Sequence, residues 1–212
     1  MKEVFDMTDD IVRSRLKVID NENDSVQEIV EKTINNLIVC LGDDPNREGL
    51  VGTPNRVYRM YKEVFEGMNY SNHDIANMFN KCFEDVETGD LVTVTNIPIF
   101  SYCEHHIALM YNMKVHVGYI PNGKVIGLSK VARIADMCAK RLQLQERIGI
   151  DISEVLHEVL GTDDIIVVIE GEHSCMTARG IKSRGSITRT ASIRGRFESD
   201  SDLRSEFYNL TR

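Results

Sequence analysis

The chain has 212 residues, enough for one sizeable domain with a helical appendage, and a formal net charge of −8. This acidic balance argues against binding of nucleic acid, and no apolar stretch is long enough to cross a membrane. The five cysteines are scattered and the first residues, MKEVFDMTDD, lack the apolar centre of a secretory signal, so we expect free thiols and a cytoplasmic location.

The first predicted elements are helices. Apolar residues recur at helical spacing over 26–38, behind Ser25 or Asp24 as the N-cap. Thr53-Pro54 predicts the start of a second helix, with threonine as the cap, and a third short helix is expected over 72–81. We therefore divide this part of the chain into an acidic tail, residues 1–24, and a helical region, residues 25–90.

The pattern then changes to that of strands. Val92–Thr95 alternates polar and apolar residues, and Pro98 indicates that this strand lies at an edge or ends nearby. Residues 113–119 alternate in the same way. Pro121-Asn122-Gly123 is typical of a tight turn, and it predicts a returning strand over 124–128.

Two helices and two strands complete the chain. A helix capped by Ser129 precedes a longer one over 144–160. An apolar strand follows at 165–169, and 186–197 alternates as the last strand. The order of helices followed by β-β-α-α-β-β predicts an α+β fold, in which an antiparallel sheet over residues 91–212 carries helices on one face.

The strongest chemical signal comes from two short segments, Cys-Glu-His-His at 103–106 and His-Ser-Cys at 173–175. Catalytic zinc takes thiolate and imidazole ligands, three from the protein, and keeps one position open for water. Three residues fit that count: Cys103, His106 and Cys175. His105 and His173 are then left beside the metal as acid–base groups. A Cys-x-x-His pair alone is equally compatible with a structural site or with chance, and His105 with a structural histidine.

Two further motifs suit a phosphorylated purine. Glu146 can accept the two parallel hydrogen bonds that a guanine edge donates, although Gln-Glu-Arg at a helix start is commonly a cap and a solvated face. The start of a predicted helix carries Ser129, Lys130 and Arg133. A helix N-terminus with nearby cations can bind phosphate groups. The alternative interpretation is a capped helix whose cations are simply exposed to solvent. Basic residues are frequent between 130 and 196, which fits a small polyanion better than a polymer.

Taken together, these motifs resemble the zinc-dependent GTP cyclohydrolase I family over residues 25–210. Besides the two metal-ligand segments, the matching runs are Glu48-Gly49-Leu50, Thr53-Pro54-x-Arg56-Val57, Tyr119-Ile120-Pro121, Val125–Lys130 with Arg133-Ile134, Gln143-x-Gln145-Glu146-Arg147 and Ala178-Arg179-Gly180. The resemblance implies N-terminal helices followed by a tunnelling (T-) fold, an antiparallel four-stranded sheet with two helices packed on one face. It also implies a homodecamer of two stacked pentamers, an allosteric enzyme whose active sites lie at subunit junctions.

The reaction implied by this resemblance is hydrolytic opening of the GTP imidazole ring, with formate release, rearrangement and re-closure to 7,8-dihydroneopterin triphosphate. This is the first step of folate or pterin biosynthesis. The resemblance also implies one Zn²⁺ per subunit on the three ligands named above. His173 would protonate the N7 side of the purine, His105 would transfer protons during ring opening and deformylation, and Ser129 would assist at the ribose. The implied substrate contacts are Gln145 and Glu146 for the guanine edge, Lys130, Arg133 and Arg179 for the triphosphate, and Arg56 and Arg59 from a neighbouring subunit.

Two other kinds of protein fit the motifs less well. Among tunnelling-fold enzymes, pterin synthases bind zinc through three histidines, which this chain does not offer in a compact set, and a nitrile reductase needs a nicotinamide cofactor, for which there is no dinucleotide motif. A regulatory protein with a structural zinc would leave the spare histidines without a role. The chain departs from the family at Ile107-Ala108, where a Leu-Pro pair is common, and at Arg59, where lysine is frequent.

Overall fold

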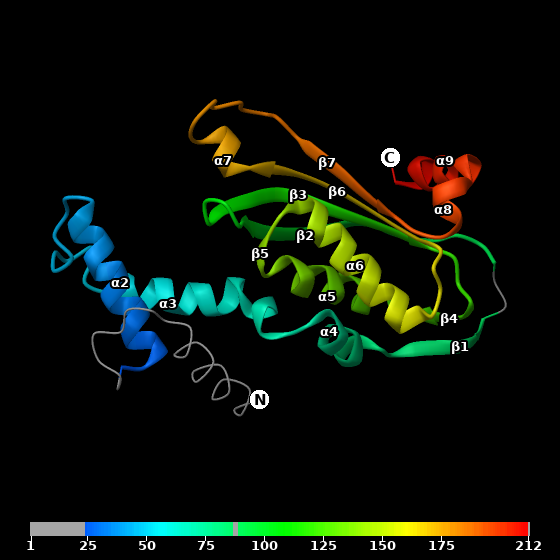
Figure 1. The fold of residues 1–212 in the computed structure, drawn as a ribbon, viewed down its shortest axis with the longest axis horizontal. Coiled ribbons are helices and arrows are strands. Elements are labelled where there is room, and N and C mark those ends of the chain that lie inside the picture. Colours follow the sequence, from blue (N-terminus) through cyan, green and yellow to red (C-terminus); the bar gives the residue numbers. More distant parts are fainter. Residues whose placement is uncertain (1–23, 87–88, 212) are drawn as a thin grey trace. The chain divides into compact units, whose positions relative to one another are not determined.

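A computed structural model of the chain describes residues 24–86 and 89–211 (Figure 1). The described residues up to Val64 form one compact unit, and those from Phe65 onward form a second. The acidic tail expected over 1–24 lies outside the described residues, apart from Asp24. No helix in the part of the chain that the structure describes has the length and apolar character needed to traverse a bilayer.

The first unit contains α2 (Val26–Cys40) and α3 (Thr53–Val64). The Ser25 hydroxyl accepts a hydrogen bond from the Glu28 backbone, and the Glu28 carboxylate accepts one from the Ser25 backbone N–H, which confirms Ser25 as the N-cap. Arg56 and Arg59 lie on α3, where both are exposed.

The second unit contains a five-stranded sheet of order β5-β2-β3-β6-β7. The four long strands run antiparallel, as predicted. The strands are β2 (Val92–Cys103), β3 (Ala108–Tyr119), β5 (Leu142–Gln143), β6 (Ile165–His173) and β7 (Thr188–Ile193). The short β5 is an addition to the expected sheet, and it pairs in parallel with β2 only at Tyr102 and Cys103. Along the rest of β2, including Pro98, the side away from β3 has no strand partner among the described residues.

The predicted hairpin between residues 113–119 and 124–128 is wrong. The second segment forms β4 (Gly123–Ile126), which pairs with β1 (Cys82–Val86) in a separate two-stranded sheet. The reason is that β3 has no free edge. At its C-terminal end Tyr119 already pairs with Val92 of β2 on one side and with Ile165 of β6 on the other.

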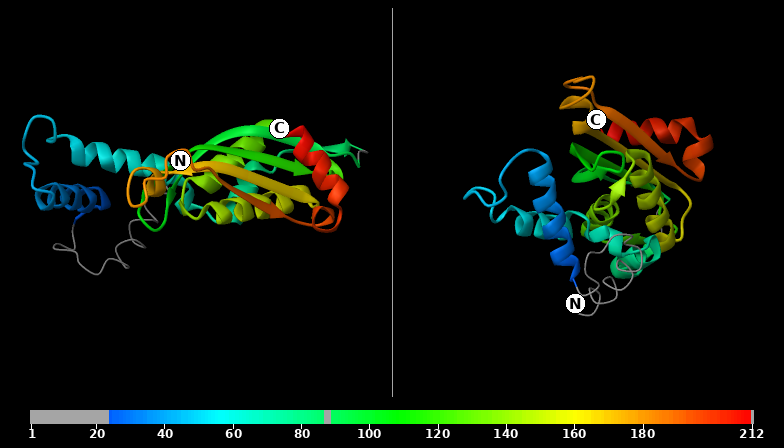
Figure 2. Two further views of the ribbon diagram at one scale, coloured as in Figure 1. Left: turned by 90° about the horizontal axis from the view of Figure 1, so that it is seen from above. Right: turned by 60° about the vertical axis from the view of Figure 1, so that its left-hand side comes forward.

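Two helices cover one face of the sheet, α5 (Leu128–Ala139) and α6 (Gln145–Leu160) (Figures 1 and 2). Gly127 is the N-cap of α5 and no side chain caps this end, so the prediction that Ser129 caps the helix is wrong. The following helix, α6, ends as expected at Gly161, whose φ of 66° suits a residue without Cβ.

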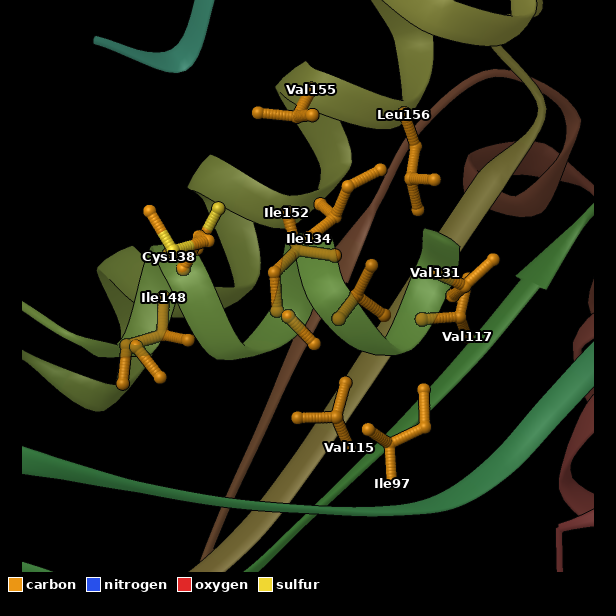
Figure 3. Close-up of a cluster of buried hydrophobic side chains, with 14 of the residues drawn as sticks. Ile97, Val115, Val117, Val131, Ile134, Cys138, Ile148, Ile152, Val155 and Leu156 are labelled. Atoms are coloured by element: carbon orange, nitrogen blue, oxygen red, sulfur yellow. The ribbon is translucent and has the colours of Figure 1, made fainter. Parts of the chain in front are cut away.

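The core lies between these helices and the sheet. Figure 3 shows Ile134 and Cys138 of α5 facing Ile152 of α6, with Val115 and Ile97 of the sheet beneath them. Ile134, Ile152 and Val115 are completely buried, and each such aliphatic side chain contributes about 1.5–3 kcal/mol on transfer from water. This packing holds the strands in fixed register, and therefore fixes the positions of their ends.

The remaining helices are η1 (Glu66–Asn69), α4 (Asn72–Phe79), α7 (Ser174–Thr177), α8 (Arg196–Ser199) and α9 (Ser201–Leu210). The last two bury Phe197 and Phe207 against Ile120 and Ile166 in a second apolar cluster. Adding a Cβ to Gly118 of β3 would place it 2.6 Å from the Phe207 ring. Neighbouring residues of β6 are buried in the two different clusters, Ile166 in this one and Val167 in the first, which explains the nearly continuous apolar run at 165–169.

Candidate metal centre

The turn between β2 and β3 presents the first two candidate ligands. The strands end on the pair Cys103–Ala108, and the Cys103 carbonyl accepts hydrogen bonds from the backbone N–H groups of His106 (3.4 Å) and Ile107 (2.9 Å). Ile107 adopts a φ of 50°, a left-handed conformation that is strained for a β-branched residue. This tight turn brings His106 back beside Cys103.

Cys175 reaches the same end of the sheet on α7. His173, the last residue of β6, pairs with Met110 near the start of β3, so that α7 begins next to the β2–β3 turn (Figure 1). One ligand atom from each of Cys103, His106 and Cys175 lies within 4.8 Å of the others. Cys103 is buried, Cys175 is half-buried and His106 is exposed.

These three side chains fit a divalent metal ion. Tetrahedral zinc with bonds of about 2.0–2.3 Å places its ligand atoms roughly 3.3–3.8 Å apart, so the cluster needs only small side-chain shifts. Burial and the neighbouring Cys103 thiol raise the pKa of the Cys175 thiol. Two thiolates this close repel each other, and a cation between them removes that cost.

Two exposed side chains lie against the candidate ligands. His105 Nδ1 is 3.6 Å from Cys103 Sγ. Arg179 Nη1 is 2.8 Å from His106 Nε2, and because a guanidinium can only donate, Nε2 accepts this hydrogen bond. The structure therefore places a histidine and an arginine, both predicted to act on the substrate, at the rim of the cluster.

His173 lies deeper than His105. Its Nε2 is 2.8 Å from Oε1 of Gln145, the first residue of α6. Burial lowers the pKa of His173 below its ordinary value, against a smaller opposing effect of the Glu146 carboxylate. A neutral imidazole is therefore favoured at this position.

Glu146 is exposed next to His173, in the first turn of α6. Among the residues that the structure describes, its carboxylate has no hydrogen bond or ion pair, whereas the following Arg147 pairs with Glu104 at 2.6 Å. Glu146 can thus use both carboxylate oxygens for a ligand.

The predicted phosphate contacts Ser129, Lys130 and Arg133 are not part of this cluster. They lie on the first turns of α5, beside β4, and the Lys130 ammonium lies 5.8 Å from the centre of the Phe79 ring. The opposite end of α5 leads to β5, which pairs with Cys103. A 12-residue helix is about 18 Å long, so the two groups lie at opposite ends of α5. Arg56 and Arg59 belong to the first unit.

A polar network that the sequence patterns did not predict supports the ligand turn. Arg141 donates to the Gly67 and Tyr70 carbonyls and to the carboxylate of Asp151. The Gln143 side chain also donates to Asp151 (2.7 Å), and the Gln143 backbone carbonyl accepts from Glu104 N–H (3.1 Å). The only available signal was the position of Gln143 in the Gln-x-Gln-Glu-Arg run.

An antiparallel sheet with two helices on one face and a Cys-His-Cys cluster at its end defines a tunnelling-fold protein with a candidate metal centre. The family profile described as GTP cyclohydrolase I matches residues 30–212, so the chain belongs to the GTP cyclohydrolase I family.

Similar curated proteins carry the same description. GTP cyclohydrolase 1 of Clostridium acetobutylicum is 58% identical over 178 residues, covering 82% of this chain and 91% of that protein. The protein of that name from Clostridium botulinum strain Kyoto is 58% identical over 176 residues, covering 81% and 90%. A third, from Ruminiclostridium cellulolyticum, is 55% identical over 179 residues, covering 82% and 92%.

Proposed function

We propose that this chain catalyses the GTP cyclohydrolase I reaction, in which GTP and water give formate and 7,8-dihydroneopterin triphosphate. Family membership makes it a hydrolase that acts on GTP. The observation that carries the finer assignment is the Cys103, His106 and Cys175 cluster, with His105 beside it and His173 at the end of the strand that leads to Cys175. Its product would enter folate or pterin biosynthesis.

We assign Zn²⁺ to the cluster because two thiols and one imidazole form a donor set suited to that ion. When bound, zinc with an open position supplies a water whose pKa falls to about 7, and hence hydroxide at neutral pH. Cys103 would hold the ion from the end of β2, His106 from the turn between β2 and β3, and Cys175 from α7.

The chain's own side chains then carry the proton transfers and the recognition. His173 would protonate the purine at N7, and the more exposed His105 would move protons during ring opening and deformylation. Glu146, with both oxygens available, would accept the ring N–H and the exocyclic amine of guanine. Arg179 would hold phosphate oxygens close to the cluster.

The separation of Ser129, Lys130 and Arg133 from the cluster supports a site shared between subunits. These residues lie at the far end of α5, so we propose that a second copy supplies them, with Arg56 and Arg59 from a neighbouring copy as well. The homodecamer is part of this proposal.

The test is to incubate the purified protein with GTP and to measure formate together with a fluorescent pterin after oxidation, with zinc analysis in parallel. Cys175→Ser should lose zinc and turnover together. Cys40→Ser is the matched control, because Cys40 is a free, exposed thiol on α2, and it should keep both. Formate release by a Cys175→Ser protein without zinc would contradict the proposal.

A further inference from the structure

The position of the Gln145 side-chain amide is fixed by two strands. The residue is only 1% exposed, and its Nε2 donates to the backbone carbonyls of Ile169 (3.1 Å) and Thr188 (3.1 Å). Backbone carbonyls can only accept. The two amide hydrogens therefore point at β6 and β7. If the amide were flipped, Oε1 would face the Ile169 and Thr188 carbonyl oxygens without a hydrogen between them, which is repulsive.

This orientation determines the protonation pattern of His173. With Nε2 of Gln145 turned to the strands, Oε1 is the atom that faces His173 Nε2 at 2.8 Å. An amide oxygen can only accept, so the imidazole must donate, and the hydrogen of the neutral ring resides on Nε2. The Nδ1 lone pair is left for another partner.

We infer that Gln145 is a positioning residue which holds His173 as the Nε2–H tautomer and directs Nδ1 to the substrate. This inference rests on the proposed function, since it concerns the proton transfers of that reaction. In the reaction the Nδ1 lone pair first accepts the proton that the attacking water releases as its O–H bond breaks. Nδ1 then passes this proton to purine N7, whose lone pair forms the new N–H bond, and the ring returns to the neutral Nε2–H form. The bond to Gln145 persists throughout, so the ring does not need to turn.

The inference gives Gln145 a role other than the guanine contact implied by the resemblance. Both of its donors are used within the protein, and its side chain is buried. In this assignment Glu146 alone reads the guanine edge, while Gln145 connects α6, β6 and β7 to the catalytic histidine.

The first experiment reads the tautomer directly. Zinc-loaded protein labelled with ¹⁵N-histidine is sedimented and studied by magic-angle-spinning NMR at about pH 8, where a neutral imidazole is expected. The His173 signals are identified by their loss in His173→Asn. We expect protonated Nε2 and bare Nδ1, and a His173 ring protonated at Nδ1 would overturn the inference whatever the variants do.

Three variants separate positioning from packing. Gln145→Leu removes the acceptor, so we expect a tautomer mixture and a kcat at least about tenfold lower, with KM changed much less. Gln145→Glu retains an acceptor, so Nε2–H should persist. Ser153→Ala is the control, because Ser153 lies on the same helix, is equally buried, and its hydroxyl makes no hydrogen bond among the described residues; it should leave the tautomer unchanged.

Failure of this inference differs from failure of the proposed function. The tautomer is measured without GTP, so a protein with protonated Nε2 that releases no formate would refute the activity and not the positioning of His173. A Gln145→Leu protein with only the Nε2–H form and an unchanged kcat would refute the positioning alone.

Discussion

Replacing Arg141 with methionine should destabilise the protein by an amount that the structure allows us to estimate. Arg141 lies between α5 and β5, with 15% of its side chain exposed, and pairs at 2.9 Å with Asp151, whose side chain is 12% exposed. Its guanidinium also donates to the Gly67 carbonyl, the Tyr70 carbonyl and the Asn72 side chain. Methionine keeps much of the apolar stem and removes every one of these donors.

The main cost is the carboxylate that remains. Without Arg141, Asp151 keeps the neutral donors Gln143 and Asn72, and the Gly67 and Tyr70 carbonyls lose a charged donor. Removing one member of a buried ion pair costs about 3–5 kcal/mol, a large part of a typical unfolding free energy of about 5–15 kcal/mol. For a chain of this size each kcal/mol corresponds to roughly 2–4 °C, so the unfolding midpoint should fall by about 6–20 °C.

The assay is urea and thermal unfolding, followed by circular dichroism at one protein concentration, because an oligomer's apparent stability depends on concentration. Arg47→Met is the control, since its partner Asp43 is about half exposed and screened by solvent. If both variants unfold at the wild-type midpoint, the Arg141 network does not have the energetic role assigned to it. Zinc affinity should also fall with Arg141→Met. Arg141 holds the Asp151 carboxylate, which in turn holds the Gln143 side chain. The Gln143 carbonyl accepts the Glu104 N–H in the ligand turn, so the turn loses part of its support.

Four further predictions concern the site and its surroundings. Glu146→Gln should lower kcat/KM for GTP about 10- to 100-fold through the loss of charge-assisted hydrogen bonds; equal use of GTP and ATP by the unmodified protein would contradict guanine reading by this residue. His105→Ala should retain zinc by metal analysis and lose turnover, whereas an unchanged rate would make it a structural histidine. Lys130→Met should raise KM for GTP about tenfold with zinc content unchanged, and an unaltered KM would remove Lys130 from the triphosphate site. Burial lowers the pKa of His116 below its ordinary value of 6.5, against a smaller opposing effect of the Glu170 carboxylate. Below about pH 6.5 the unfolded chain therefore binds a proton that the folded protein does not bind. The free energy of unfolding decreases as the pH falls from there towards the lowered pKa. His116→Gln should flatten this part of the stability profile in unfolding experiments from pH 7 to 5, and an unchanged slope would refute the assignment.

Periodicity and local chemistry were sufficient for much of the fold. Helix ends such as the Ser25 cap and the Gly161 terminus depend on interactions between residues close together in the sequence. The order of helices and strands depends on the local spacing of apolar residues. Both can therefore be predicted from the sequence. The segments 103–106 and 173–175 were recognisable for a similar reason, since zinc restricts its ligands to a few residue types.

Tertiary structure alone decided which strand the segment at 124–128 joins. Both edges of β3 were already occupied by β2 and β6, so the segment could not return along β3, and it pairs with β1 instead. Strand pairing depends on which edges remain open, and that is a property of the whole sheet.

The same holds for the roles of the side chains. Gln145 and Glu146 are adjacent in the sequence, but the start of α6 buries one between β6 and β7 and leaves the other exposed. Ser129 and Cys103 belong to one set of motifs, and α5 holds them a helix length apart. Residue identity determined which chemistry was available, whereas burial and separation, which depend on how the elements pack, determined which atoms can carry it out.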